Sequence, residues 1–104
     1  MPPVSTKAEV LERLRQQQGQ LRALGVARLG LFGSFVRDEA GPDSDVDLLA
    51  QLDANALTLN GYFALVDFLE DLLGRPVEVL TPGSLSRHIG PHILREVADV
   101  PLAA

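Results

Sequence analysis

Apolar and polar residues alternate with the period of a helix along the N-terminal segment. Thr6 and Glu9 form a capping-box pattern, in which the threonine hydroxyl accepts from the Glu9 amide and the glutamate reaches back over the first turn. The apolar positions that recur at helical spacings are Val10, Leu11, Leu14, Leu21 and Leu24. Gly25 ends the pattern, because glycine adopts the left-handed conformation that closes many helices. The pattern therefore predicts one helix over residues 5–24.

Three short apolar segments have the length and pattern of β-strands. Residues 26–32 lie between turn residues and are too short for a helix. Residues 45–52 begin with polar and apolar side chains in alternation, as in a half-buried strand. Residues 76–80 place one charged residue, Glu78, between two valines. Between the first two predicted strands, residues 34–39 have the composition of one or two helical turns.

Two further helices are predicted in the second half of the chain. The first covers residues 59–73, where apolar residues follow a 3.6-residue period, and we assign Tyr62 and Phe63 to its buried side. The second covers part of residues 85–97 and is either split or started by Gly90–Pro91. Its expected inward residues are Ile89, Ile93, Leu94 and Val97. The order α-β-α-β-α-β-α indicates a small α/β or α+β domain with helices packed on a sheet.

Composition and charge limit the function. With 104 residues, of which 46% are hydrophobic and 22% charged, the chain has the balance of one globular domain. A net charge of -5 argues against a stand-alone nucleic-acid binder, which needs surplus Lys and Arg to neutralise phosphates. The absence of cysteine excludes disulfides, thiolate metal ligands and a cysteine nucleophile. No membrane-span or signal-peptide pattern occurs, so we expect a cytoplasmic protein with no membrane partner.

Gly33, Ser34 and two aspartates form the first candidate site. Gly33 and Ser34 end the first predicted strand, and such a turn offers backbone amides and a hydroxyl to phosphate groups. Asp45 and Asp47 are two residues apart in the next predicted strand, so both project from one face of the sheet. Two close carboxylates repel unless protonated or bridged by cations, and Mg²⁺ takes oxygen ligands. Each piece alone is also compatible with an ordinary turn or a solvated strand start.

Glu78 is the third acidic candidate. Its two valine neighbours are expected to face the core, which turns Glu78 toward the opposite side of the sheet, where it can join Asp45 and Asp47. Three carboxylates from two strands can hold one or two divalent ions, which stabilise the attacking and leaving oxygens in phosphoryl or nucleotidyl transfer. Taken alone, Glu78 also fits an exposed strand residue.

Other polar residues are less informative. Arg37 either contacts phosphate or pairs with Asp43 or Glu39 at the surface. His88 and His92 are four apart, but a Gly-Pro pair lies between them and no acidic ligand is evident nearby. We therefore assign the histidines a structural or surface role rather than metal binding.

The candidate residues occur in an order that resembles a known family. The segment GSFVRDEAGPDSDVDLL resembles the nucleotidyltransferase signature of the DNA polymerase β superfamily, in which Gly-Ser precedes Asp-x-Asp. It is most similar to the minimal nucleotidyltransferases, or MNT proteins, of bacteria and archaea, and the resemblance covers roughly residues 24–97. Two positions depart from the pattern: Asp38 stands where many members carry Gly, and Glu78 where many carry Asp.

The resemblance implies a nucleotidyltransferase fold, a small mixed β-sheet flanked by helices. It implies a single domain over residues 1–104, with an N-terminal helix at about 5–24 and a catalytic core at about 25–98. It also implies ATP as substrate and two Mg²⁺ ions. The implied nucleotide-binding residues are Gly33, Ser34 and Arg37, and the implied catalytic and metal-binding residues are Asp45, Asp47 and Glu78.

A partner is implied as well. MNT proteins are usually encoded beside a HEPN-domain protein and resemble the antitoxin of a toxin–antitoxin pair; some transfer AMP from ATP to a tyrosine of the HEPN toxin and block its RNase activity. We therefore predict a metal-dependent protein adenylyltransferase that forms a hetero-oligomer with a HEPN toxin. Two alternatives stay open: a non-catalytic antitoxin that acts by binding the toxin, and a nucleotidyltransferase for a small-molecule hydroxyl such as that of an aminoglycoside.

Overall fold

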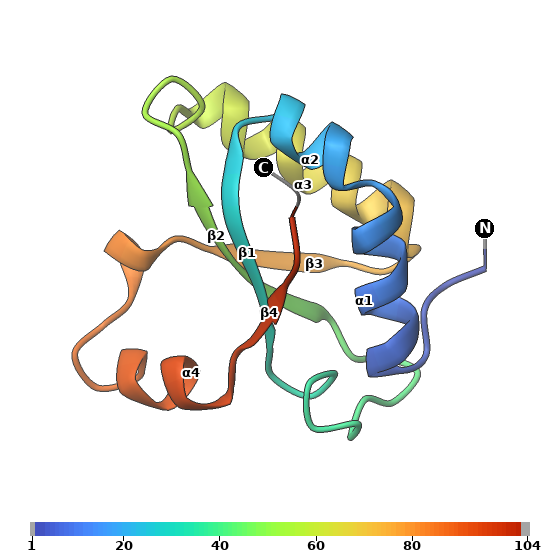
Figure 1. Ribbon diagram of the computed structural model, residues 1–104. Helices are drawn as coiled ribbons and strands as arrows, with labels where there is room; N and C mark the ends of the chain where they lie inside the picture. Colours follow the sequence, from blue (N-terminus) through green and yellow to red (C-terminus); the bar gives the residue numbers. More distant parts are fainter. Residues whose placement is uncertain (1, 103–104) are drawn as a thin grey trace.

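A four-stranded mixed sheet forms the centre of the computed structural model, which describes residues 2–102 (Figure 1). The strands are β1 (Val26–Phe32), β2 (Val46–Leu52), β3 (Val77–Leu80) and β4 (Ala98–Val100). The helices are α1 (Lys7–Gln16), α2 (Gln18–Ala23), α3 (Leu59–Leu73) and α4 (Gly90–Glu96), with a 3₁₀ turn, η1, at Pro82–Ser84. The strand order is β3-β2-β1-β4, in which β1 is antiparallel to both neighbours and β2 is parallel to β3. The predicted class, helices on a small mixed sheet, is confirmed.

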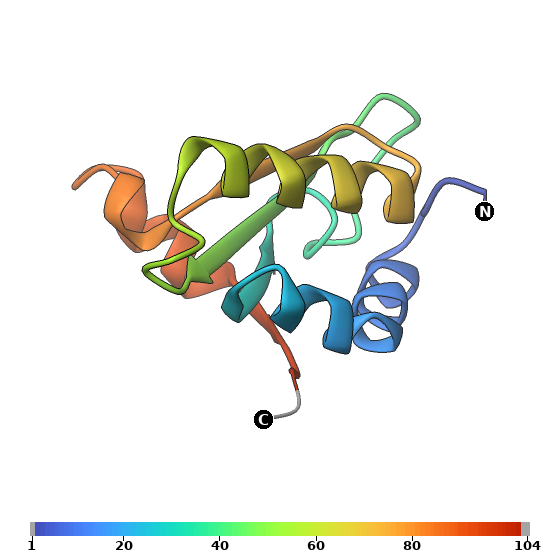
Figure 2. The same ribbon diagram turned by 90° about the horizontal axis from the view of Figure 1, so that it is seen from above.

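The two faces of the sheet differ in their cover. Along β2, Val46, Leu48 and Ala50 are fully buried, whereas the intervening residues, among them Asp47, are only partly covered. Helices α1 and α2 pack over the β1 and β4 side and α3 over β3, all on the buried face (Figures 1 and 2). Helix α4 lies apart from them, across the sheet (Figure 1). The face that carries Asp47 is therefore the more open one.

The predicted N-terminal helix is two helices rather than one. The Thr6 hydroxyl accepts from the Glu9 amide at 3.2 Å, as the capping box predicts, and the Glu9 carboxylate accepts from the Ser5 amide at 3.1 Å. The helix breaks at Gln17, with φ -108° and ψ 22°. The break falls in a Gln-rich stretch followed by a glycine, where no apolar side chain between Leu14 and Leu21 packs to keep the helix continuous.

The remaining elements follow the predictions with small corrections. Strand β1 has the predicted bounds, β3 lies within the predicted strand, and β2 starts at Val46, so Asp45 precedes the strand. Residues 34–39 form turns and no helix. Helix α4 starts at Gly90 with Pro91 in its first turn, which was one of the two readings. Strand β4 was not predicted, because three residues with a central aspartate carry too little apolar pattern.

Several residues assigned to the core lie at the surface. Phe63 is 53% exposed, because the buried side of α3 is set by Leu65 and Leu69, and a residue two positions before Leu65 points to the opposite side. Ile89 and Leu94 are also exposed, so their assignment was wrong, whereas Ile93 is buried. Leu59, the first residue of α3, and Leu57, just before the helix, are exposed as well.

Candidate active site

A sharp turn after β1 brings backbone and carboxylate together. Gly33 has φ 78°, a conformation that side chains rarely adopt. A Cβ atom at this position would lie 2.0 Å from Oδ2 of Asp47, so the aspartate occupies the space a side chain would need. Two features therefore require glycine at position 33: the left-handed backbone conformation and the close approach of Asp47.

Asp47 and Glu78 face each other across two parallel strands. Asp47 on β2 is paired in register with Glu78 on β3 and, on its other side, with Phe32 on β1. Paired residues of neighbouring strands project from the same face, so the two carboxyl groups stand side by side. The predicted convergence of these two residues near Gly33 is therefore what the backbone produces.

The surroundings of Asp47 disfavour its ionised form. Burial, a hydrogen bond with Glu78 and the negative charges of Glu78, Asp45 and Glu96 raise the pKa of Asp47 from 3.8 to about 6. A protonated Asp47 donates in that hydrogen bond, and ionisation replaces it with repulsion. This part of the sheet therefore favours an added positive charge, whether a proton or a metal cation.

Asp45 takes part in this cluster only through its charge. It lies one residue before β2 with an exposed side chain. Within residues 2–102, no three His, Asp or Glu side chains converge closely enough to hold a metal ion as they stand. Of the three predicted residues, Asp47 and Glu78 lie together, and the side chains of Asp45 and Glu78 are exposed.

Glu96, at the end of α4, is a site residue that sequence reasoning missed. One oxygen of its carboxylate accepts from the Gly33 amide at 2.8 Å, and the other accepts from Nη1 of Arg37 at 2.8 Å. The hydrogen bond from Gly33 and the guanidinium of Arg37 hold the pKa of Glu96 below its ordinary value. Arg37 also donates to Glu39 at 3.0 Å, so its predicted surface pairing with Glu39 is present. No local motif marks Glu96, because its contacts are 63 and 59 residues away in the chain.

A model of the nucleotidyltransferase domain matches residues 7–99. This chain belongs to the nucleotidyltransferase family. It is 38% identical over 96 residues to the protein adenylyltransferase MntA of Thermococcus cleftensis, an alignment that covers 91% of this chain and 96% of the relative.

Solved structures have the same fold. One of a minimal nucleotidyltransferase has a TM-score of 0.71 and 34% identity, covering 85% of this chain and 93% of that one. A toxin–antitoxin structure with AMP-PNP has a TM-score of 0.70 at 18% identity, covering 89% of this chain and 73% of that one. The resemblance to minimal nucleotidyltransferases is confirmed.

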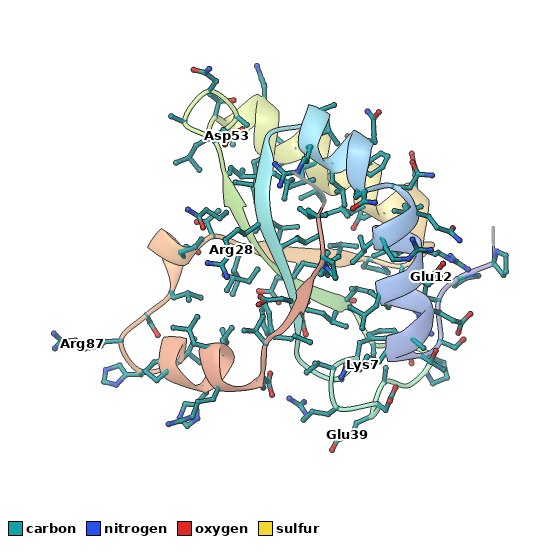
Figure 3. All side chains as sticks on the ribbon, viewed as in Figure 1. Lys7, Glu12, Arg28, Glu39, Asp53 and Arg87 are labelled. Carbon is teal, nitrogen blue, oxygen red and sulfur yellow. The ribbon has the colours of Figure 1, made fainter. Side chains whose placement is uncertain are left out.

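The two departures from the family pattern have different structural consequences. Asp38, where many members carry Gly, has φ 54°, so this position does need the left-handed conformation. Aspartate tolerates it, and its Oδ1 accepts from the Lys7 amide at 3.0 Å, which attaches α1 to the turn after β1. Figure 3 shows the Lys7 side chain at the same end of the molecule as Glu39, which ends that turn. Glu78, where many members carry Asp, stands in register beside Asp47.

Arg75 holds the loop that leads to Asp45 and Asp47. Its Nη1 donates to the carbonyl oxygens of Gly41, Pro42 and Ser44 at 2.9, 3.2 and 3.0 Å, and its Nε donates to that of Val4 at 2.6 Å. Its guanidinium also lies 5.2 Å from the ring centroid of a buried phenylalanine, Phe35. One side chain thus connects the turn after β1 with the loop before Asp45.

The two histidines lie at the surface of the molecule. His88 and His92 are both exposed, and Nδ1 of His92 lies 3.0 Å from Nη2 of Arg95, which is consistent with a surface role. None of the helices described for residues 2–102 has the length and apolar character needed to span a membrane.

Proposed function

We propose that this nucleotidyltransferase is the antitoxin of an MNT/HEPN pair and transfers AMP from ATP to the hydroxyl of a tyrosine in the HEPN toxin. The observation that carries the proposal is the 38% identity to a protein adenylyltransferase along nearly the whole of both chains. The carboxylates beside the Gly33 turn support the proposal, because nucleotidyl transfer uses metal ions held by such groups to stabilise the charge on the reacting phosphate. The toxin–antitoxin structure with AMP-PNP agrees in fold.

The carboxylates fit the magnesium ions that the family implies. Asp45, Asp47 and Glu78 offer only oxygen ligands, and burial together with the neighbouring carboxylates raises the pKa of Asp47 to about 6, so an added cation would favour its ionised form. These three residues would hold the ions. When bound, Mg²⁺ would neutralise charge on the phosphates and favour ionisation of the acceptor hydroxyl.

The turn after β1 would position the nucleotide. The Gly33 amide, the Ser34 hydroxyl and the Arg37 guanidinium are hydrogen-bond donors at one end of β1, and phosphate oxygens accept from such groups. Asp47 packs against the same turn, so phosphates bound there would lie beside the carboxylates. Proximity of donor groups and carboxylates is what would align the α-phosphate for attack.

A folded protein is the acceptor that suits this chain. Its net charge of -5 makes nucleic acid a poor acceptor. ATP as the donor places the reaction, in this proposal, in the cytoplasm.

The test is adenylylation of the HEPN-domain protein encoded beside this chain. Both proteins are co-expressed, and the intact mass of each is measured for the wild type, Asp45→Asn and Asp47→Asn, with Asp67→Asn on the exposed side of α3 as the charge-matched control. We expect the partner to gain one or more AMP masses with the wild type and with Asp67→Asn only. If both site variants still neutralise the HEPN toxin as well as the wild type does, the protein is instead an antitoxin that acts by binding. AMP found only on an added aminoglycoside would establish a small-molecule transferase.

A further inference from the structure

Glu96 occupies the hydrogen-bond donors that a phosphate would need. Its two carboxylate oxygens accept from the Gly33 amide and from Nη1 of Arg37, both at 2.8 Å. These donors come from the turn after β1, whereas Glu96 is the last residue of α4. The contact therefore joins two distant segments at one point.

A carboxylate in this position resembles a phosphate in charge and in its accepting oxygens. Backbone amides and guanidinium groups bind both anions through short, charge-assisted hydrogen bonds. The Gly33 amide has one hydrogen, so a phosphate oxygen that takes it must replace the Glu96 oxygen. A phosphate that arrived while Glu96 stayed would also meet its negative charge, beside those of Asp47 and Glu78.

We propose that Glu96 is a built-in competitor of the nucleotide, which holds the phosphate-binding donors of the free protein and must leave when a triphosphate binds. This inference rests on the proposed function, because it takes Gly33 and Arg37 as phosphate-binding residues. Competition of this kind lowers the affinity for ATP and keeps the turn ordered when no nucleotide is bound. Since only Val97 separates Glu96 from β4, its release also frees the link between α4 and the edge of the sheet.

The opposite role is a fixed positioning residue. In that case Glu96 would stay on Gly33 and Arg37 with nucleotide bound and hold Arg37 for contact with the phosphates. The two roles differ in the sign of a substitution: removing a competitor tightens nucleotide binding, and removing a positioning residue weakens it.

Glu96→Gln is the discriminating variant, because it keeps the shape and one accepting oxygen but removes the charge. Glu39→Gln is the matched control: Glu39 pairs with the same guanidinium at 3.0 Å, and Figure 3 shows its side chain pointing outward from the loop. The dissociation constant of AMP-PNP with Mg²⁺ is measured by calorimetry for both variants and the wild type. We expect Glu96→Gln to bind about tenfold more tightly, the equivalent of one charge-assisted hydrogen bond, and Glu39→Gln to stay within about twofold.

If the wild type binds AMP-PNP and Glu96→Gln binds it equally or more weakly, the inference is overturned and the proposed function is left intact. Failure of the wild type and of Glu39→Gln to bind AMP-PNP would instead reject the proposed function, and the inference with it. A second measurement uses the unmodified protein, so it does not depend on how the variant folds. The carboxyl ¹³C resonance of Glu96 should move when AMP-PNP and Mg²⁺ are added, and a resonance that stays in place at saturation would overturn the inference.

Discussion

Asp47→Asn should make the protein more stable while it removes the proposed activity. Burial disfavours the ionised Asp47 carboxylate, and the neighbouring Glu78 and the charges of Asp45 and Glu96 add to this, so that its pKa is raised from 3.8 to about 6. At about 1.4 kcal/mol per pKa unit, a fully shielded carboxylate would cost the folded state about 3 kcal/mol at neutral pH. Solvent screening at this partly exposed group reduces the expected cost to about 1–2 kcal/mol.

The sign of the pH dependence follows from the direction of the pKa change. A carboxyl group that binds its proton more tightly in the folded state stabilises the fold below its unfolded pKa, and this stabilisation is lost as the pH rises through the folded pKa. The difference between Asp47→Asn and the wild type should therefore be small at pH 3.5, grow between about pH 4 and 6, and stay constant above pH 7.

Thermal unfolding in metal-free buffer measures this difference. For a domain of this size, about 1–2 kcal/mol corresponds to roughly 5–10 °C in the melting temperature at pH 7.5. Asp67→Asn, which removes the same charge from an exposed position on α3, should shift the melting temperature by much less. A variant that melts at or below the wild-type temperature at pH 7.5, or a gain that does not depend on pH, would refute the reasoning.

Three further substitutions test the frame of the site. Gly33→Ala should lower the free energy of unfolding by about 1–3 kcal/mol in urea and weaken AMP-PNP binding, because its Cβ would collide with Asp47 at a φ of 78°. Arg75→Lys should cost about 2 kcal/mol in the same assay, since one ammonium group cannot reach all of the carbonyl oxygens that the guanidinium contacts. Tyr62→Phe should cost about 1 kcal/mol, because the Tyr62 hydroxyl donates to the Val79 carbonyl at 3.0 Å, and should leave AMP-PNP binding unchanged.

The sequence was sufficient to predict the elements whose signals are local. Strand β1 and helix α3 have the predicted bounds, because breakers flank the first and Thr58 and Gly74 cap the second. Strand alternation also predicted that Glu78 lies on the same face of the sheet as Asp47, and the parallel pairing of β2 with β3 supplies the register that puts them side by side.

Features that depend on distant contacts could not be predicted. Strand β4 exists because β1 offers an edge to Ala98–Val100, and nothing in those three residues requires a strand. Arg75 was not singled out, because its partners lie 31–71 residues away. Phe63 was assigned to the core as part of the apolar stripe of α3, but the rotation of α3 on the sheet leaves it exposed.

The strands and the Arg75 contacts hold the carboxylates of the site together although their like charges destabilise the fold. Asp47 lowers stability when ionised, yet its pairing with Phe32 and Glu78 fixes the face from which it projects, and its side chain packs against Gly33. Arg75 holds the loop before Asp45 to the buried Phe35, which follows the same turn. The paired strands and the half-buried Arg75 side chain thus keep like charges together, and a cation that binds beside them relieves that repulsion.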